Sequence, residues 1–135
     1  MYNDLKSARE FFKNDRFAVM SGVEIEAVEK GRAVCSLDVK PVHVNSDGLI
    51  QGGAIFTLAD SAFAVASNFE TSDDCCVVTI ESNSHFLATT SSKRLVAEAS
   101  CFRDGHKICV YLVKVLDEDG VDVAFCTFMG CKIKK

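Results

Sequence analysis

The chain has 135 residues, of which 48% are apolar and 25% charged, and its formal net charge at pH 7 is −4. These values predict one globular domain over residues 1–135 and argue against a disordered or nucleic-acid-binding protein, because no basic run is present. The seven cysteines form no zinc-binding or redox pair. Neither a signal peptide nor a membrane-spanning run is apparent, so we expect a cytoplasmic protein with reduced thiols and no membrane partner.

The first third of the chain is predicted to contain a short helix and a β-hairpin. Within residues 3–15, Leu5, Ala8 and Phe11 recur at helical spacing. Apolar residues then alternate in residues 23–28 and 33–39, on either side of a Lys-Gly turn, which is typical of a hairpin.

Residues 54–68 differ from their surroundings because they are rich in alanine and apolar on every side. This pattern predicts a buried helix. Residues 77–87, 94–102, 107–116 and 121–133 are four β-rich runs, the last three separated by turn sequences. The order predicts an α+β domain in which an antiparallel sheet wraps around one long central helix.

Both faces of the predicted strand at residues 107–116 are apolar. One face carries Ile108, Val110, Leu112 and Leu116, and the other carries Cys109, Tyr111, Val113 and Val115. Only one face of a strand meets the core of such a domain. The outer face is therefore expected to contact another subunit, the alternative being a loop that covers it.

Asp60 is the most unusual residue of the predicted helix, because its neighbours, such as Leu58 and Phe63, are apolar. Burial of an unpaired carboxylate is unfavourable and raises its pKa. Such groups are frequent at catalytic sites. The alternative interpretation is a local hydrogen bond to Thr57 or Ser61.

Gly52 and Gly53 precede this helix and leave amide N–H groups free at its start, where they suit a developing negative charge. Gly52 and Asp60 are eight residues apart, which is about 12 Å along a helix. Both can act on one small substrate only if Asp60 comes from a second subunit. Asn45 and Gln51 flank the loop into the helix and either position a water or carbonyl oxygen or serve as turn residues.

Other chemistries find no support in the sequence. His43, His85 and His106 have no partner at metal-ligand spacing, so no metal site is predicted. Nucleophile-elbow, phosphate-loop and dinucleotide motifs are absent.

Residues 45–60 resemble the signature of hotdog-fold acyl-CoA thioesterases, most closely the phenylacetic-acid-degradation (PaaI-like) branch. The family pattern is an Asn, a loop with Gly, a His-Gly-Gly and then Leu-Ala-Asp on the helix. Here those positions read Asn45, Gln-Gly-Gly at 51–53 and Leu-Ala-Asp at 58–60. The likeness continues through residues 79–81 and 95–99 and covers nearly the whole chain.

The resemblance implies a role for each matching residue. Asp60 matches the catalytic carboxylate, a general base or a nucleophile, and the Gly52 amide matches the group that polarises the thioester carbonyl. Asn45 matches a residue that places the water or the carbonyl, and Thr79 one that orients the attacking water. Family members are dimers of dimers in which these groups meet across two chains, so a homodimer or homotetramer is implied. Gln51 departs from the family histidine and can donate a hydrogen bond but cannot carry a proton charge.

The implied reaction is hydrolysis of a small aryl- or medium-chain acyl-CoA to the free acid and coenzyme A. Coenzyme A is then part of the substrate, and no separate cofactor is expected. Its phosphates need cations, for which the best candidates lie near turns of the last strands: Lys93, Arg94, Arg103 and Lys107.

Two alternatives stay open. A hotdog-fold acyl-CoA dehydratase or hydratase would share the fold, but it needs a histidine that the start of the helix lacks. A non-catalytic acyl-CoA-binding module would also share the fold, but the intact Asp60 and Asn45 argue against it.

Overall fold

The computed structural model describes residues 1–135 and contains three α-helices, one 3-10 helix and six strands. The helices are α1 (Leu5–Phe12), α2 (Arg16–Ser21), η1 (Pro41–His43) and α3 (Gly52–Ser67). The strands are β1 (Val23–Glu29), β2 (Arg32–Asp38), β3 (Cys75–Phe86), β4 (Arg94–Asp104), β5 (Ile108–Asp117) and β6 (Asp122–Lys134).

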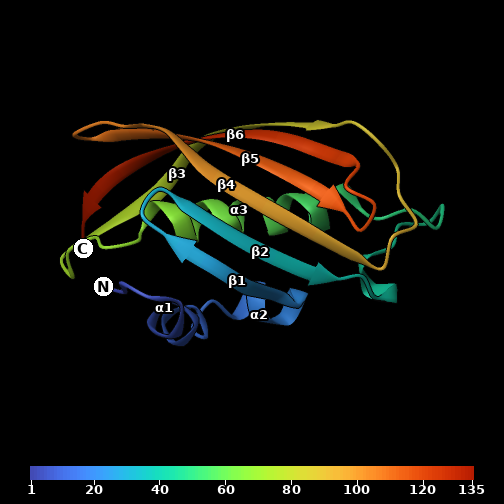
Figure 1. Ribbon diagram of the computed structural model, residues 1–135, viewed down its shortest axis with the longest axis horizontal. Helices are drawn as coiled ribbons and strands as arrows, with labels where there is room; N and C mark the ends of the chain where they lie inside the picture. Colours follow the sequence, from blue (N-terminus) through green and yellow to red (C-terminus); the bar gives the residue numbers. More distant parts are fainter.

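The six strands form one antiparallel sheet in the order β1-β2-β4-β5-β6-β3. Figure 1 shows this sheet curving around α3, while α1 and α2 lie beside β1 at one edge. The expected α+β architecture, with an antiparallel sheet around one long helix, is therefore confirmed. β3 forms the opposite edge and pairs only with β6.

The N-terminal helix departs from the sequence-based expectation, which placed one helix over residues 3–15. The structure ends α1 at Phe12 and begins a second helix after Asp15. Asp15 caps this helix by accepting a hydrogen bond from the Ala18 N–H at 3.0 Å. Gly22, with a φ of 88°, ends it in the left-handed region that favours glycine.

The helix α3 is buried on one side only, so the expectation of a helix buried all round is half wrong. Leu58, Ala59 and Phe63 face the sheet and are fully buried, and the Phe63 ring stacks on Phe128 with centroids 5.1 Å apart. The opposite side carries small or polar residues that are partly or fully exposed: Gly53, Thr57, Asp60, Ser61 and Ala64. This side of α3 is free to meet another molecule.

The two faces of β5 differ as the register requires. Cys109, Tyr111, Val113 and Val115 belong to the core, whereas the outer face remains partly exposed, with Ile108, Val110, Leu112 and Leu116. A subunit contact on this outer face remains a prediction.

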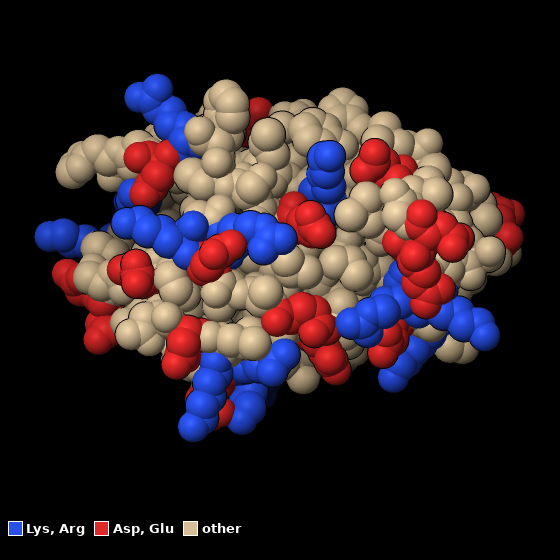
Figure 2. All heavy atoms as spheres, in the orientation of Figure 1, with Lys and Arg blue, Asp and Glu red and all other residues tan.

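Figure 2 shows acidic and basic side chains interspersed on the visible face of the molecule. None of the helices combines the length and apolar character needed to cross a lipid bilayer.

Candidate active site

Asp60 lies on the open side of α3, half-buried, and its carboxylate reaches the edge strand β3. Its Oδ1 accepts a hydrogen bond from the Thr79 hydroxyl at 3.2 Å. The alternative local bonds do not form, because Thr57 and Ser61 donate instead to backbone carbonyls one turn earlier in α3, each at 2.8 Å. Asp60 and Thr79, 19 residues apart in the chain, are thus brought together by the packing of β3 against α3.

Burial raises the pKa of the Asp60 carboxyl above its ordinary value. The hydrogen bond from Thr79 lowers the pKa, because it favours the ionised form, and the negative charge of Asp15 raises it. Burial is the largest of these effects. A partly desolvated carboxylate of this kind is a better proton acceptor than a solvated one.

The start of α3 presents one free backbone donor. Gln51 is the N-cap residue, and its side-chain oxygen accepts the Gly53 N–H at 2.5 Å. The next two N–H groups, of Ala54 and Ile55, bond to the Gln51 carbonyl at 3.0 and 3.3 Å. The Gly52 N–H makes no hydrogen bond within the chain. It is therefore available to an anion or carbonyl oxygen at the positive end of the helix.

The cap also orients the side chain of Gln51. Because its side-chain oxygen is occupied by the Gly53 N–H, its amide NH₂ is the free end of the side chain and has both donor hydrogens available. Gln51 can thus add a donor beside the Gly52 N–H but no acidic proton.

Asn45 shapes the loop that leads into α3. Its Oδ1 accepts the N–H groups of Asp47 and Leu49, both at 3.0 Å, so the turn interpretation is correct. Its side-chain amide nitrogen is left without a partner in the chain. Asn45 and Gly52 line the same cavity of about 210 Å³, which Phe86 of β3 and Thr90 of the following loop help to close.

One chain does not bring all these groups together. Asp60 is not among the residues that line the cavity at Gly52. Two turns of α3 separate the two residues, which is about 12 Å. A complete site with both groups on one thioester therefore needs a second chain.

The four cations predicted for the coenzyme A phosphates fall into two groups. Lys93 and Arg94 lie at the start of β4, and Arg103 and Lys107 lie at its far end, about 30 Å away along the strand. Arg94 is already paired, with Glu26 at 2.9 Å and with Asp38 at 2.8 Å. Within one chain the four therefore do not converge on one ligand, and none of them lines the cavity at Gly52.

His43 supports the entry loop, a role that the sequence did not indicate. The ring is 5% exposed, its Nδ1 accepts the Lys40 N–H at 2.9 Å, and its Nε2 lies 2.6 Å from the Ser21 carbonyl oxygen. Because Nδ1 accepts, Nε2 carries the proton and donates. The His43 carbonyl in turn accepts the Gln51 N–H at 2.8 Å. His43 therefore ties the end of α2 to the loop and to the residue that caps α3.

No three His, Cys, Asp or Glu side chains are grouped so that they could hold a metal ion. A half-buried carboxylate and a free helix amide are groups that suit the hydrolysis of a carbonyl substrate.

Comparison with known proteins agrees with this class. Residues 47–124 match the thioesterase superfamily, and the chain belongs to it. A putative esterase of Archaeoglobus fulgidus is 36% identical over 105 residues, which are 77% of this chain and 66% of that protein. The 1,4-dihydroxy-2-naphthoyl-CoA hydrolase of Listeria monocytogenes is 31% identical over 97 residues, which are 72% of this chain and 79% of that protein.

A solved structure supports the same assignment. The Escherichia coli PaaI protein of the phenylacetic acid degradation operon superposes with a TM-score of 0.86 at 27% identity, covering 95% of this chain and 91% of that one. The expected hotdog fold and the likeness to the PaaI-like thioesterases are confirmed, and the chain is by class a thioester hydrolase.

Proposed function

We propose that the protein is an acyl-CoA thioesterase that releases coenzyme A from a small aryl- or medium-chain acyl-CoA at a site shared by two copies of the chain. Two relatives support the substrate class: the Listeria protein is named as an acyl-CoA hydrolase, and Escherichia coli PaaI, 28% identical over 120 residues, as an acyl-coenzyme A thioesterase. The observation that carries the proposal is the half-buried, Thr79-bonded Asp60 on the open side of the same helix that begins with a free Gly52 N–H.

The chemistry follows from the two groups. Asp60, as general base, takes a proton from water while the water oxygen attacks the thioester carbon, and Thr79 holds the carboxylate in place. The carbonyl oxygen becomes an oxyanion, which the Gly52 N–H stabilises; one such donor contributes about 3 kcal/mol. Collapse of the tetrahedral intermediate breaks the C–S bond and expels the coenzyme A thiolate, which recovers the proton from Asp60. In the alternative route Asp60 attacks directly, and water hydrolyses the resulting anhydride.

Two residues complete the donor set. The free amide of Gln51 lies beside Gly52 and adds a second hydrogen bond to the carbonyl oxygen. The side-chain nitrogen of Asn45, on the wall of the same cavity, positions the thioester or the water. Because a thiolate leaves readily, the absence of a histidine acid at position 51 is compatible with turnover.

A twofold dimer would complete the site. With two α3 helices antiparallel, Asp60 of one copy faces Gly52 of the other, and symmetry generates two such sites. The β3 edge is suited to this contact because it is 12 residues long, has no partner on its outer side and exposes Val78 and Ile80. Pairing of dimers through the outer face of β5 would give a tetramer.

Release of free thiol from a panel of aryl-acetyl, hydroxyaryl and medium-chain acyl-CoA esters tests the activity. We expect turnover of at least one class and nearly complete loss of turnover with the Asp60→Asn variant. Hydration or dehydration of an enoyl- or hydroxyacyl-CoA without thiol release would instead indicate the dehydratase alternative. Binding without any reaction would indicate the non-catalytic alternative.

Subunit mixing tests the shared site. Proline is tolerated at the first position of a helix but lacks the N–H, so Gly52→Pro removes the donor and keeps α3. Each of the homodimers Asp60→Asn and Gly52→Pro is expected to be inactive. A mixed dimer has one site with both defects and one with neither, so activity should return in part. Gly52→Ala, which keeps the N–H, is the matched control, and mixed dimers without any activity would place both groups in one chain.

A further inference from the structure

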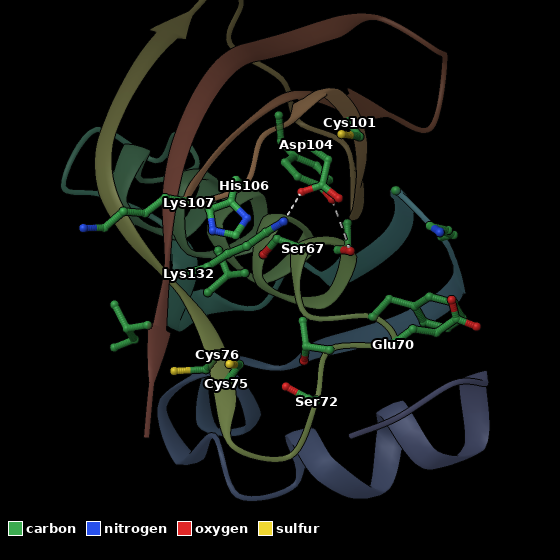
Figure 3. A pocket seen from close by; sticks show the side chains of 18 of the residues that line it. Ser67, Glu70, Ser72, Cys75, Cys76, Cys101, Asp104, His106, Lys107 and Lys132 are labelled. Atoms are coloured by element: carbon green, nitrogen blue, oxygen red, sulfur yellow. Dashed lines mark hydrogen bonds and ion pairs between the residues drawn. The ribbon is translucent and has the colours of Figure 1, made fainter.

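The largest cavity of the molecule, about 800 Å³, has no part in the proposed reaction. It lies at the C-terminal end of α3, where Ala66 and Ser67 meet the first residues of β3 and the ends of β4 and β6 (Figure 3). Gly52 is at the other end of α3, fifteen residues from Ser67, or about 22 Å. A volume of this size accommodates a drug-sized ligand.

A packed partition separates this cavity from Asp60. Asn68, 7% exposed, accepts the Val77 N–H at 2.8 Å and donates to the carbonyls of Val77 and Ala64 at 3.3 and 3.0 Å. Behind it, a Cβ added to Gly130 would lie 2.5 Å from the Val77 side chain and 2.8 Å from the Phe63 ring. This region is tightly packed, and neither Asp60 nor Thr79 lines the cavity, which is therefore distinct from the site at Asp60.

The walls and the mouth of the cavity differ in chemistry. Apolar and aromatic side chains line the interior, among them Phe69, Val77 and Tyr111. Burial raises the pKa of Tyr111, so its hydroxyl is neutral at any physiological pH, and its hydrogen bond to the Ala66 carbonyl is long at 3.5 Å. The interior thus offers an apolar surface with one weakly engaged hydroxyl.

Four of the residues that line the cavity are lysines, although the protein as a whole is acidic. Lys132 pairs with Asp104 at 2.6 Å, and Figure 3 shows this pair beside His106. Three further lysines that line the cavity, Lys30, Lys107 and Lys134, have no carboxylate partner in the chain. With Asp104 neutralised, Glu70 is the remaining acidic group, so the mouth carries a net positive charge.

We propose that this cavity binds an amphipathic organic anion, a carboxylate on an alkyl chain, whose head lies among the lysines at the mouth and whose chain packs against Val77 and Tyr111. Charge complementarity selects the carboxylate, and the apolar wall contributes through burial of the chain. The proposal concerns a second site and does not depend on the identity of the thioester hydrolysed at Asp60.

The cysteines of the cavity provide a direct readout. Cys75, Cys76 and Cys101 line it and are partly exposed, whereas Cys35, Cys109 and Cys126 are buried. Labelling with a thiol reagent, followed by peptide mass spectrometry, is expected to slow at the three lining cysteines when decanoate is added below its micelle concentration. Decanol, of similar length but uncharged, should protect at least tenfold less well.

Variants at the mouth test the role of charge. Lys107→Glu with Lys134→Glu should weaken decanoate protection by at least tenfold, whereas Lys6→Glu with Lys40→Glu, two exposed lysines elsewhere, should leave it unchanged. These are surface substitutions, and thermal melts verify that each variant is folded. In the Asp60→Asn variant, decanoate should protect the lining cysteines as well as it does in the unaltered protein. This result would separate the proposed site from the catalytic one.

Three outcomes would overturn the proposal. The first is no protection of the lining cysteines, and the second is equal protection in both double variants. The third is that these cysteines do not react even without ligand, because another copy of the chain then closes the cavity.

Discussion

The two edge strands of the sheet, β1 and β3, differ in how far other elements of the chain cover them. At the β1 edge, α1 and α2 lie alongside the strand, and Arg9 of α1 donates a hydrogen bond to the Ile25 carbonyl at 2.9 Å. At the β3 edge no element covers a strand of 12 residues, and Ile80 is 53% exposed. Proteins usually protect such edges from pairing with other chains. The β1 edge is covered by elements of the same chain, whereas the open β3 edge, which also carries Thr79, is where we expect the subunit interface and the shared site.

The largest effect on the rate of thiol release is expected from Asp60→Asn, which removes the carboxylate that is hydrogen-bonded to Thr79 on the open edge strand β3. Loss of a general base typically lowers the rate by about 10²- to 10⁴-fold. Asparagine can still accept the Thr79 hydrogen bond, so the edge itself is preserved. A steady-state assay of thiol release measures the loss, and a variant with more than half of the original turnover would contradict the assignment.

The same substitution should stabilise the fold. Because the pKa of Asp60 is raised in the folded chain, the native state binds more protons than the unfolded state between the two pKa values, and stability falls as the pH rises through the folded pKa. Asp60→Asn removes this penalty. Its melting temperature should exceed that of the unaltered protein at pH 7, and the difference should shrink as the pH is lowered. If Asp60→Asn instead melted at a lower temperature than the unaltered protein at pH 7, the ionised Asp60 carboxylate would not destabilise the fold.

The next effect concerns the edge strand. Ile80→Lys places a charge on the β3 edge, and twofold symmetry places two in each interface, where unpaired charges weaken association. We expect dimer dissociation to increase at least tenfold, with activity falling on dilution, as sedimentation and dilution assays measure. Glu24→Lys, an exposed position on β1, is the matched control. Equal behaviour of the two variants would mean that β3 is not the interface.

A smaller effect is expected at His43, which fixes the loop before α3. His43→Ala leaves the Lys40 N–H and the Ser21 carbonyl without partners, at a cost of about 3 kcal/mol in the free energy of unfolding. The turnover number should fall more than the Michaelis constant changes, because the Gly52 N–H is displaced while the binding surface remains. Denaturant titration and kinetics measure both, and unaltered kinetics would limit His43 to stability.

The sequence predicted this architecture because hydrophobic periodicity is a local signal. Strands such as β1 alternate apolar and polar residues, and α3 is recognised by its alanines. The helix α2 was missed because it has only six residues and depends on two end residues, Asp15 and Gly22, more than on periodicity.

The candidate site was predictable where a residue contradicts its surroundings or matches a family motif. Asp60 met both conditions, whereas His43 met neither, because its partners are backbone atoms of distant segments. Arg94 shows a further limit. The sequence suggested Arg94 as a cation available to the coenzyme A phosphates. The β2–β4 register instead places it opposite Asp38, with which it forms an ion pair. Such tertiary neighbours follow only from strand order.

The smallest expected effects are two opposite shifts in the pH dependence of catalysis. The Thr79 hydrogen bond lowers the pKa of Asp60, and the charge of Asp15 raises it. A general base must be ionised, so the rate falls on the acid side as the pH drops through this pKa. Thr79→Val, which keeps the shape of the side chain, should therefore move the acid limb of the kcat profile to higher pH. Asp15→Asn, which can still cap α2, should move it to lower pH. Shifts of the same sign in both variants would indicate a general loss of structure, and an unmoved limb in both would assign it to a group other than Asp60.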